Sequence, residues 1–234
     1  DLLRQSASDV GNDHRLGANE APPAIISVFL GDQLDDVVKQ LVETGEATHS
    51  LEGSVLKTEV NTLPDFEKDA TDRNRTSPFA FTGNKFEFRM LGSQDSLSNC
   101  NVVLNTIAAE AFEEACDRLE KAEDFDKELN ALIVEYTEKH KRIIFSGNGY
   151  SKEWQEEAQR RGLPNLPTMV DAIPALTTDA SIEMFEHFKV FTKAELSARA
   201  EIQYEIYAKA INIEARTMID MATKQIIPAV VKYT

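Results

Sequence analysis

The chain has 234 residues, of which 42% are apolar, and carries 25 Lys and Arg against 40 Asp and Glu, a formal charge of −15. This length allows one large or two small domains, and the apolar share is enough to bury a core. The acidic balance argues against nucleic acid and anionic membrane surfaces as partners, and no apolar run approaches the ~20 residues of a membrane-spanning helix.

The cysteine content favours a reduced, cytoplasmic setting. Cys100 and Cys116 are too few for a disulfide framework or a zinc site, and both are expected to be small core residues. The chain starts at Asp1 without a Met and without a signal-like apolar stretch. We therefore expect either processing or a piece of a longer protein.

The N-terminal third combines loops with short regular elements. Glycines and prolines in residues 1–23 are typical of loops, and the apolar run 24–30 between Pro23 and Gly31 predicts a buried strand. A helix is predicted from an N-cap at Asp32 to a stop at Gly45. Its apolar residues recur at helical spacing and predict a face on the core: Leu34, Val37, Val38, Leu41 and Val42.

A strand with one charged face is predicted further along the chain. Residues 46–72 are polar and without a sustained period, which indicates a surface insertion. Over 85–91 the period is two, so one face carries charges and the other is apolar. The charged residues are Lys85, Glu87 and Arg89, and the apolar ones are Phe86, Phe88 and Met90.

From about Asn99 the apolar period becomes 3.6, which predicts helices. The first stripe runs to Tyr136 and is broken by glycines at 147–149. Further helices are predicted over 151–161, over 179–188, and from about 193 to 227, the last ending before Pro228. Four or five helices with short breaks favour an antiparallel bundle.

Two charged patterns are candidates for chemistry. Arg15 and Glu20 lie in a Gly/Pro loop directly before the predicted strand, where functional loops are often anchored, although a solvated surface loop has the same composition. Glu87 lies between Lys85 and Arg89 on one strand face. This pattern fits an ordinary ion-pair ladder, or a metal or anionic substrate bound over that face.

The other polar residues are weaker candidates. Arg73 and Arg75 lie in a Ser/Thr/Asn/Pro loop, where guanidinium groups suit phosphates, but an arginine pair alone is a weak signal. The four histidines lack the spacing of metal ligands, and each is expected at the surface: His14, His49, His140 and His187.

Three motifs in order resemble the late catalytic motifs of glutamine synthetases: Asn-Glu-Ala-Pro at 19–22, Asn-Arg-Thr-Ser-Pro at 74–78 and Lys-Phe-Glu-Phe-Arg at 85–89. The longer phrases at 11–31 and 73–89 look specifically like the type III enzymes. The resemblance is strong over 11–93, and a helical C-terminal extension is also a type III feature.

The resemblance implies a role for each matching residue. Glu20 corresponds to the flap glutamate that closes the ammonium site and takes a proton from the nitrogen, and Arg15 to an arginine that holds glutamate. Arg75 corresponds to a catalytic arginine on the nucleotide phosphates and the transferring phosphoryl group. Glu87 corresponds to a ligand of the metal beside the ATP phosphates. Arg89 corresponds to the arginine that binds glutamate and its acyl-phosphate.

The sequence departs from the family pattern at three places. Arg15 and Glu20 are five apart, where the commoner form has six. Ala80 stands where many relatives have a second phosphate arginine. Lys85 replaces a frequent arginine near the nucleotide, which keeps the charge but loses the planar fork.

The implied reaction is the ATP-dependent amidation of glutamate by ammonium through a γ-glutamyl phosphate, with Mg²⁺ or Mn²⁺. Charge builds up on the phosphoryl group, which is what metals and arginines stabilise. The family's other metal ligands have no counterpart here. We therefore expect a C-terminal fragment, inactive alone, of a parent that forms a ring-based dodecamer with active sites between subunits.

The expected fold class is α+β. Residues 1–98 are predicted to be the end of the antiparallel-sheet barrel domain, with a helical insertion at about 31–72, and residues 99–234 a helical C-terminal domain. Two other functions stay open: a helical interaction or assembly module without catalysis, and a ligase that amidates a different amine.

Overall fold

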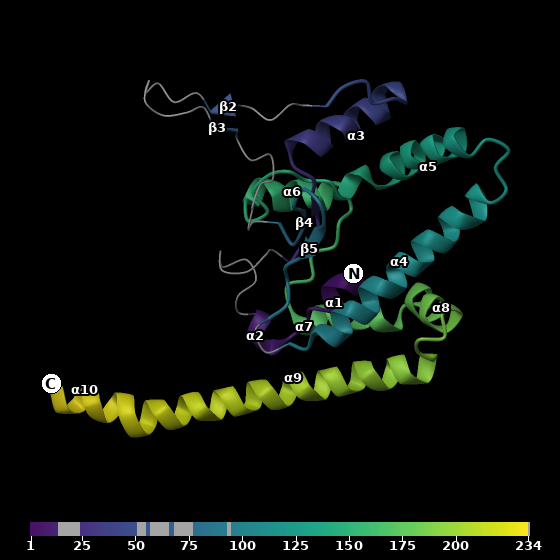
Figure 1. Ribbon diagram of the computed structural model, residues 1–234. Coiled ribbons are helices and arrows are strands. Elements are labelled where there is room, and N and C mark those ends of the chain that lie inside the picture. Colours follow the sequence, from purple (N-terminus) through teal and green to yellow (C-terminus); the bar gives the residue numbers. More distant parts are fainter. Residues whose placement is uncertain (14–23, 51–54, 57–65, 68–76, 93–94, 234) are drawn as a thin grey trace.

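The computed structural model describes residues 1–13, 24–50, 55–56, 66–67, 77–92 and 95–233 (Figure 1). Within these residues the strands are short: β1 (Val28–Phe29), β2 (Val55–Leu56), β3 (Phe66–Glu67), β4 (Phe79–Phe81) and β5 (Phe86–Phe88). Two short N-terminal helices and one longer helix accompany them: α1 (Leu2–Gln5), α2 (Val10–Asp13) and α3 (Asp32–Thr44).

The part after residue 95 is helical. Its α-helices are α4 (Leu97–Leu119), α5 (Phe125–His140), α6 (Lys152–Arg160), α7 (Met169–Ala172), α8 (Asp179–His187), α9 (Lys193–Met221) and α10 (Ile227–Tyr233). Two 3₁₀ turns, Lys141–Ile143 and Ile173–Thr177, and one π-helical turn, Ala222–Ile226, join them. No helix within the described residues has both the length and the apolar composition needed to cross a membrane.

Strands β1, β4 and β5 form one small mixed sheet with β4 in the centre. β4 pairs parallel with β1 and antiparallel with β5, so that Ala80 lies opposite Glu87. The predicted strand over 24–30 is regular only at 28–29, because β4 offers it just two pairing positions. The structure confirms a mixed α and β composition, and the predicted barrel remains an expectation.

The helix expected after residue 31 is confirmed, with one difference at its start. Gly31, at φ 82°, is the N-cap, so Asp32 is the first helical residue and not the cap that its side chain suggested. Gly45, at φ 79°, ends the helix in the left-handed conformation, as predicted. The apolar stripe of α3 is only half-buried, facing α5 and the segment 141–146. The insertion after α3 also contains a two-residue ladder between β2 and β3, which its polar composition did not indicate.

The main core lies where α7, the Ile173–Thr177 turn and α8 meet α2, α4 and α9. Phe185, Ile173 and Leu196 are fully buried there. Side-chain caps at Ser96, Ser151 and Thr192 fix the starts of α4, α6 and α9. The predicted helices over 151–161 and 179–188 are thereby confirmed to within a residue or two.

A second, smaller core joins α6 to the sheet. Trp154 is 1% exposed and stacks on Phe145 with ring centroids 3.8 Å apart. Ile25, just before β1, packs into the same cluster, and the amide of Phe145 donates a hydrogen bond to the carbonyl of Val28. The helical part and the sheet are therefore in direct contact.

Two expectations for the helical part are wrong. Cys100 is buried, but Cys116 is exposed, because the second half of α4 extends beyond the core; Phe112 beside it is 70% exposed. The last helix also continues through Pro228, which is the second residue of α10. Proline has no amide hydrogen for the helical hydrogen-bond ladder, and the π turn before Pro228 accommodates it. In this turn the amide of Ile227 donates to the carbonyl of Ala222, five residues back.

Candidate functional site

The strand predicted over 85–91 is regular only at 86–88, but its charged residues form a compact group: Glu87 lies on β5, and Lys85 and Arg89 flank the strand. The guanidinium of Arg89 donates two hydrogen bonds to Oε2 of Glu87, at 3.1 Å from Nε and 3.0 Å from a terminal nitrogen. The ammonium of Lys85 lies 3.5 Å from Oε1 of the same carboxylate. One carboxylate is thus shared by two cations on one strand face, as the period of two predicts.

The electrostatics of this group favour an anionic ligand. The hydrogen bond from Arg89, assisted by Lys85, holds the pKa of the Glu87 carboxyl below its ordinary value, so the carboxylate stays ionised at neutral pH. Two cations and one anion leave a net positive charge on this face within a strongly acidic chain. Arg89 is held more firmly than Lys85, because its side chain is 20% exposed against 65% for Lys85.

The register explains why Glu87 pairs along its own strand. Ala80 lies directly opposite Glu87 on β4 and is fully buried, so no cross-strand charge competes for the carboxylate. Position 80 is where many relatives of the resembled family have a second arginine. An arginine there would lie across from Glu87, and in this chain that position offers only a methyl group.

Two other motif segments approach the same end of β5. The amide of Arg89 donates a 2.9 Å hydrogen bond to the carbonyl of Pro78, the last residue of the motif at 74–78. The side-chain amide of Asn12, three residues before Arg15, donates a 2.7 Å hydrogen bond to the carbonyl of Met90. Asn12, from the phrase at 11–31, and Pro78, from the motif at 74–78, therefore contact the chain at the neighbouring residues Met90 and Arg89, whereas the motif at 19–22 lies outside the described residues.

The other predicted site residues lie outside the described residues. These are Arg15, Glu20 and Arg75, and with them Arg73 and His14. Their roles remain predictions. The remaining histidines, His49, His140 and His187, are exposed as expected.

Glu87 alone does not make a metal site. Mg²⁺ takes about six oxygen ligands, whereas Glu87 supplies one carboxylate that already accepts from Arg89. No group of three or more His, Cys, Asp or Glu that could hold a metal occurs among the residues that the structure describes. The chain as described can contribute one ligand to a metal, and the others must come from elsewhere.

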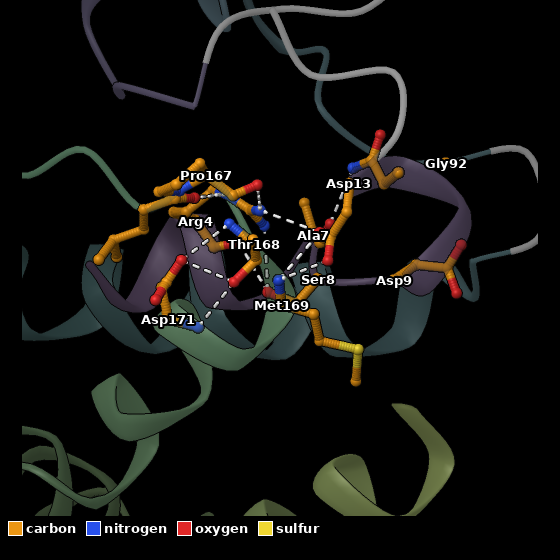
Figure 2. Close-up of polar contacts among 12 residues, drawn as sticks. Arg4, Ala7, Ser8, Asp9, Asp13, Gly92, Pro167, Thr168, Met169 and Asp171 are labelled. Atoms are coloured by element: carbon orange, nitrogen blue, oxygen red, sulfur yellow. Dashed lines mark hydrogen bonds and ion pairs between the residues drawn. The ribbon is translucent and has the colours of Figure 1, made fainter. Parts of the chain in front are cut away.

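The residues that hold this region together were not among the predicted site residues. Arg4 is 1% exposed, and its guanidinium donates to the carbonyls of Leu166 (2.8 Å) and Pro167 (3.4 Å) and lies 3.6 Å from the Asp13 carboxylate. Both oxygens of Asp13 lie 2.9 Å from the amide nitrogen of Met169. Figure 2 shows Asp13 and Met169 facing each other. Asn12 and Asp13 lie inside the motif phrase at 11–31, which is the one signal that pointed to them.

Comparison with known proteins shows that this chain is similar to glutamine synthetases. The model of the glutamine synthetase C-terminal domain matches residues 128–234. The chain is 42% identical over 232 residues to the type-3 glutamine synthetase of Dictyostelium discoideum, covering 98% of this chain and 31% of that protein. It is 43% and 40% identical to the glutamine synthetases of Butyrivibrio fibrisolvens and Bacteroides fragilis, covering 99% and 100% of this chain and 33% of each relative. The chain therefore spans about a third of the length of these relatives.

Proposed function

Because this chain is related along its whole length to glutamine synthetases, we propose that it is the C-terminal part of a type III glutamine synthetase, an ATP-dependent glutamate–ammonia ligase. The observation that carries the proposal lies at the end of β5, where Asn12 of the phrase at 11–31 and Pro78 of the motif at 74–78 contact Met90 and Arg89, and where Glu87 is held between Arg89 and Lys85. A net positive strand face beside an ionised carboxylate suits a site for phosphates and carboxylates.

The proposed reaction has two steps. An oxygen of the glutamate γ-carboxylate attacks the γ-phosphorus of ATP, which releases ADP and forms γ-glutamyl phosphate. The nitrogen of ammonia then attacks the acyl carbon, and phosphate leaves. Arg89 stabilises the negative charge on the acyl-phosphate, and Glu20 accepts the proton that ammonium loses.

The remaining assignments concern binding. We assign Arg15 to glutamate, and Arg75 and Lys85 to the nucleotide phosphates, with Arg75 also on the transferring group. When bound, Mg²⁺ or Mn²⁺ would neutralise phosphate charge. Glu87 would supply one of its ligands, and residues of the parent outside this chain would supply the others.

The exposed apolar residues of the last helix support an assembled parent. A helix with apolar side chains on several faces is normally covered. In α9, the π turn and α10 the exposed apolar residues are Ile202, Ile206, Ile213, Met218, Ile219, Met221, Ile226, Ile227, Val230 and Val231. This favours a homo-oligomer, which we propose to be the ring-based dodecamer of the resembled family.

The test is the formation of γ-glutamyl hydroxamate from glutamate, hydroxylamine and Mg·ATP. We expect activity from the full-length parent and none from this chain alone, because among the described residues Glu87 is the one ligand that we assign to the metal. A silent parent would contradict the proposed function. Activity of the isolated chain would show instead that the missing ligands are not required.

A further inference from the structure

Asn12 ties the N-terminal segment to the strand that carries Glu87 and Arg89. Its side chain is 1% exposed, and Nδ2 donates to the carbonyls of Ala7 (2.9 Å) and Met90 (2.7 Å). Both N–H groups of the amide are therefore used. Met90 is fully buried and follows Arg89 directly, so this contact fixes the backbone at the end of the charged face.

Asp13, the next residue, ties the same segment to the helical part. Its carboxylate accepts from the amide of Met169, the first residue of α7 (Figure 2). A capping box between Thr168 and Asp171 holds α7 in place at this point. The buried Arg4 closes the junction through Leu166, Pro167 and Asp13.

We propose that Asn12 and Asp13 are positioning residues, through which the helices after residue 95 set the position of the Lys85–Glu87–Arg89 face. These two adjacent residues contact distant parts of the chain: Asn12 contacts Met90, 78 residues further along, and Asp13 contacts Met169, 156 residues further along. Because one peptide bond joins Asn12 to Asp13, a shift of α7 is transmitted through these two residues to the backbone beside Arg89. A displacement of about 1 Å at a reacting group lowers a rate by about 100-fold. The catalytic consequence rests on the proposed function, whereas the coupling itself does not.

The experiment uses the full-length enzyme that contains this chain, with two independent readouts. Hydrogen exchange of the amides of residues 86–92 reports the coupling, and kcat and KM for glutamate report its consequence. The variants are Asn12→Ala and Asp13→Ala. If Asn12→Ala does not fold, Asn12→Ser replaces it, because a serine hydroxyl is too short to reach the carbonyls of both Ala7 and Met90. Asp13→Asn keeps an acceptor for the amide of Met169.

Asn99→Ala is the matched control. Like Asn12→Ala, it removes a side-chain amide that donates to a backbone carbonyl, in this case the carbonyl of Ser6 at 3.4 Å. This hydrogen bond joins α4 to the end of α1 and does not involve β5. We expect Asn12→Ala and Asp13→Ala to speed exchange at 86–92 by about tenfold or more, with α8 unchanged. We expect kcat/KM to fall by about tenfold or more. Asp13→Asn keeps the acceptor for Met169 but removes the charge beside Arg4, so we expect smaller changes than in Asp13→Ala, and no change in Asn99→Ala.

The outcomes separate this inference from the proposed function. Unchanged exchange at 86–92 in both alanine variants, or an equal change in Asn99→Ala, would overturn the coupling. Faster exchange at 86–92 with unaltered kinetics would refute positioning in catalysis. If the wild-type enzyme forms no glutamine, the proposed function fails, and exchange still decides whether the coupling exists.

Discussion

Arg89→Lys in the full-length enzyme is expected to lower kcat/KM for glutamate by about 100- to 1000-fold, the usual effect of losing one preorganised donor to a developing negative charge. The guanidinium holds Glu87 by two hydrogen bonds that converge on its Oε2, from a side chain that is 20% exposed. Lysine keeps the charge but offers a single point contact, so neither the carboxylate nor an acyl-phosphate is held in a fixed orientation. Steady-state kinetics with saturating Mg·ATP measure the effect.

Arg160→Lys is the control for this substitution. Arg160 pairs with Glu157 on the surface of α6, where its side chain is 74% exposed. Exposed pairs contribute little, so we expect kinetics within about twofold of the wild type. If Arg89→Lys retained more than half of the wild-type kcat/KM, Arg89 would not act on the reacting groups.

Arg4→Met is expected to destabilise this chain by about 3–5 kcal/mol, because breaking a buried ion pair leaves its partners without compensation. The Asp13 carboxylate would lose the positive charge of the Arg4 guanidinium. The carbonyls of Leu166 and Pro167 would lose the hydrogen-bond donor that this guanidinium provides. At this chain length the loss corresponds to a fall in Tm of roughly 6–20 °C. Fluorescence of Trp154, the one tryptophan of the chain, and circular dichroism follow the unfolding.

Arg118→Met tests whether burial is the reason. Arg118 contacts two carboxylates, Glu128 and Glu135, which raise its pKa, but its side chain is 34% exposed. Solvent screens such contacts, so we expect a clearly smaller loss of stability, and a smaller fall in Tm, than in Arg4→Met. Equal losses in the two variants would show that the number of carboxylate contacts matters, and not the depth of burial.

Elements fixed by local signals could be predicted from the sequence. The cap at Ser151 and the stop at Gly45 act within a few residues, and the structure confirms both. Of the strand that the period of two predicts over 85–91, the structure confirms the part at 86–88. The common face of Lys85, Glu87 and Arg89 follows from that period alone. These predictions needed no knowledge of the distant parts of the chain.

Features that depend on distant partners could not be predicted. The length of β1 depends on its pairing with β4, since Val28 pairs with Phe79, 51 residues further along the chain. Cys116 is exposed because the core ends before the second half of α4. The burial of Arg4 could not be predicted, because the two carbonyls to which it donates, those of Leu166 and Pro167, lie 162 and 163 residues further along the chain. Passage of the last helix through Pro228 depends on a π turn, which a propensity scale that penalises proline does not anticipate.

The candidate site was predictable mainly through its motifs. Spacing alone left Glu87 open between an ion-pair ladder and a binding site, and the ion pairs observed are compatible with both. The meeting of Asn12, Pro78 and Met90 depends on the tertiary fold and adds what the spacing lacked. Arg15, Glu20 and Arg75 lie outside the described residues, and their roles stay predictions.

Transfer of oxygen-18 from the γ-carboxylate of labelled glutamate into inorganic phosphate, measured with the full-length enzyme, Mg·ATP and ammonium, tests the central claim most directly. If γ-glutamyl phosphate forms, the attacking oxygen stays on phosphorus when ammonia displaces phosphate. One labelled oxygen per turnover is then expected in the phosphate released. Glutamine formed together with unlabelled phosphate would contradict the acyl-phosphate route, and with it the role assigned to Arg89.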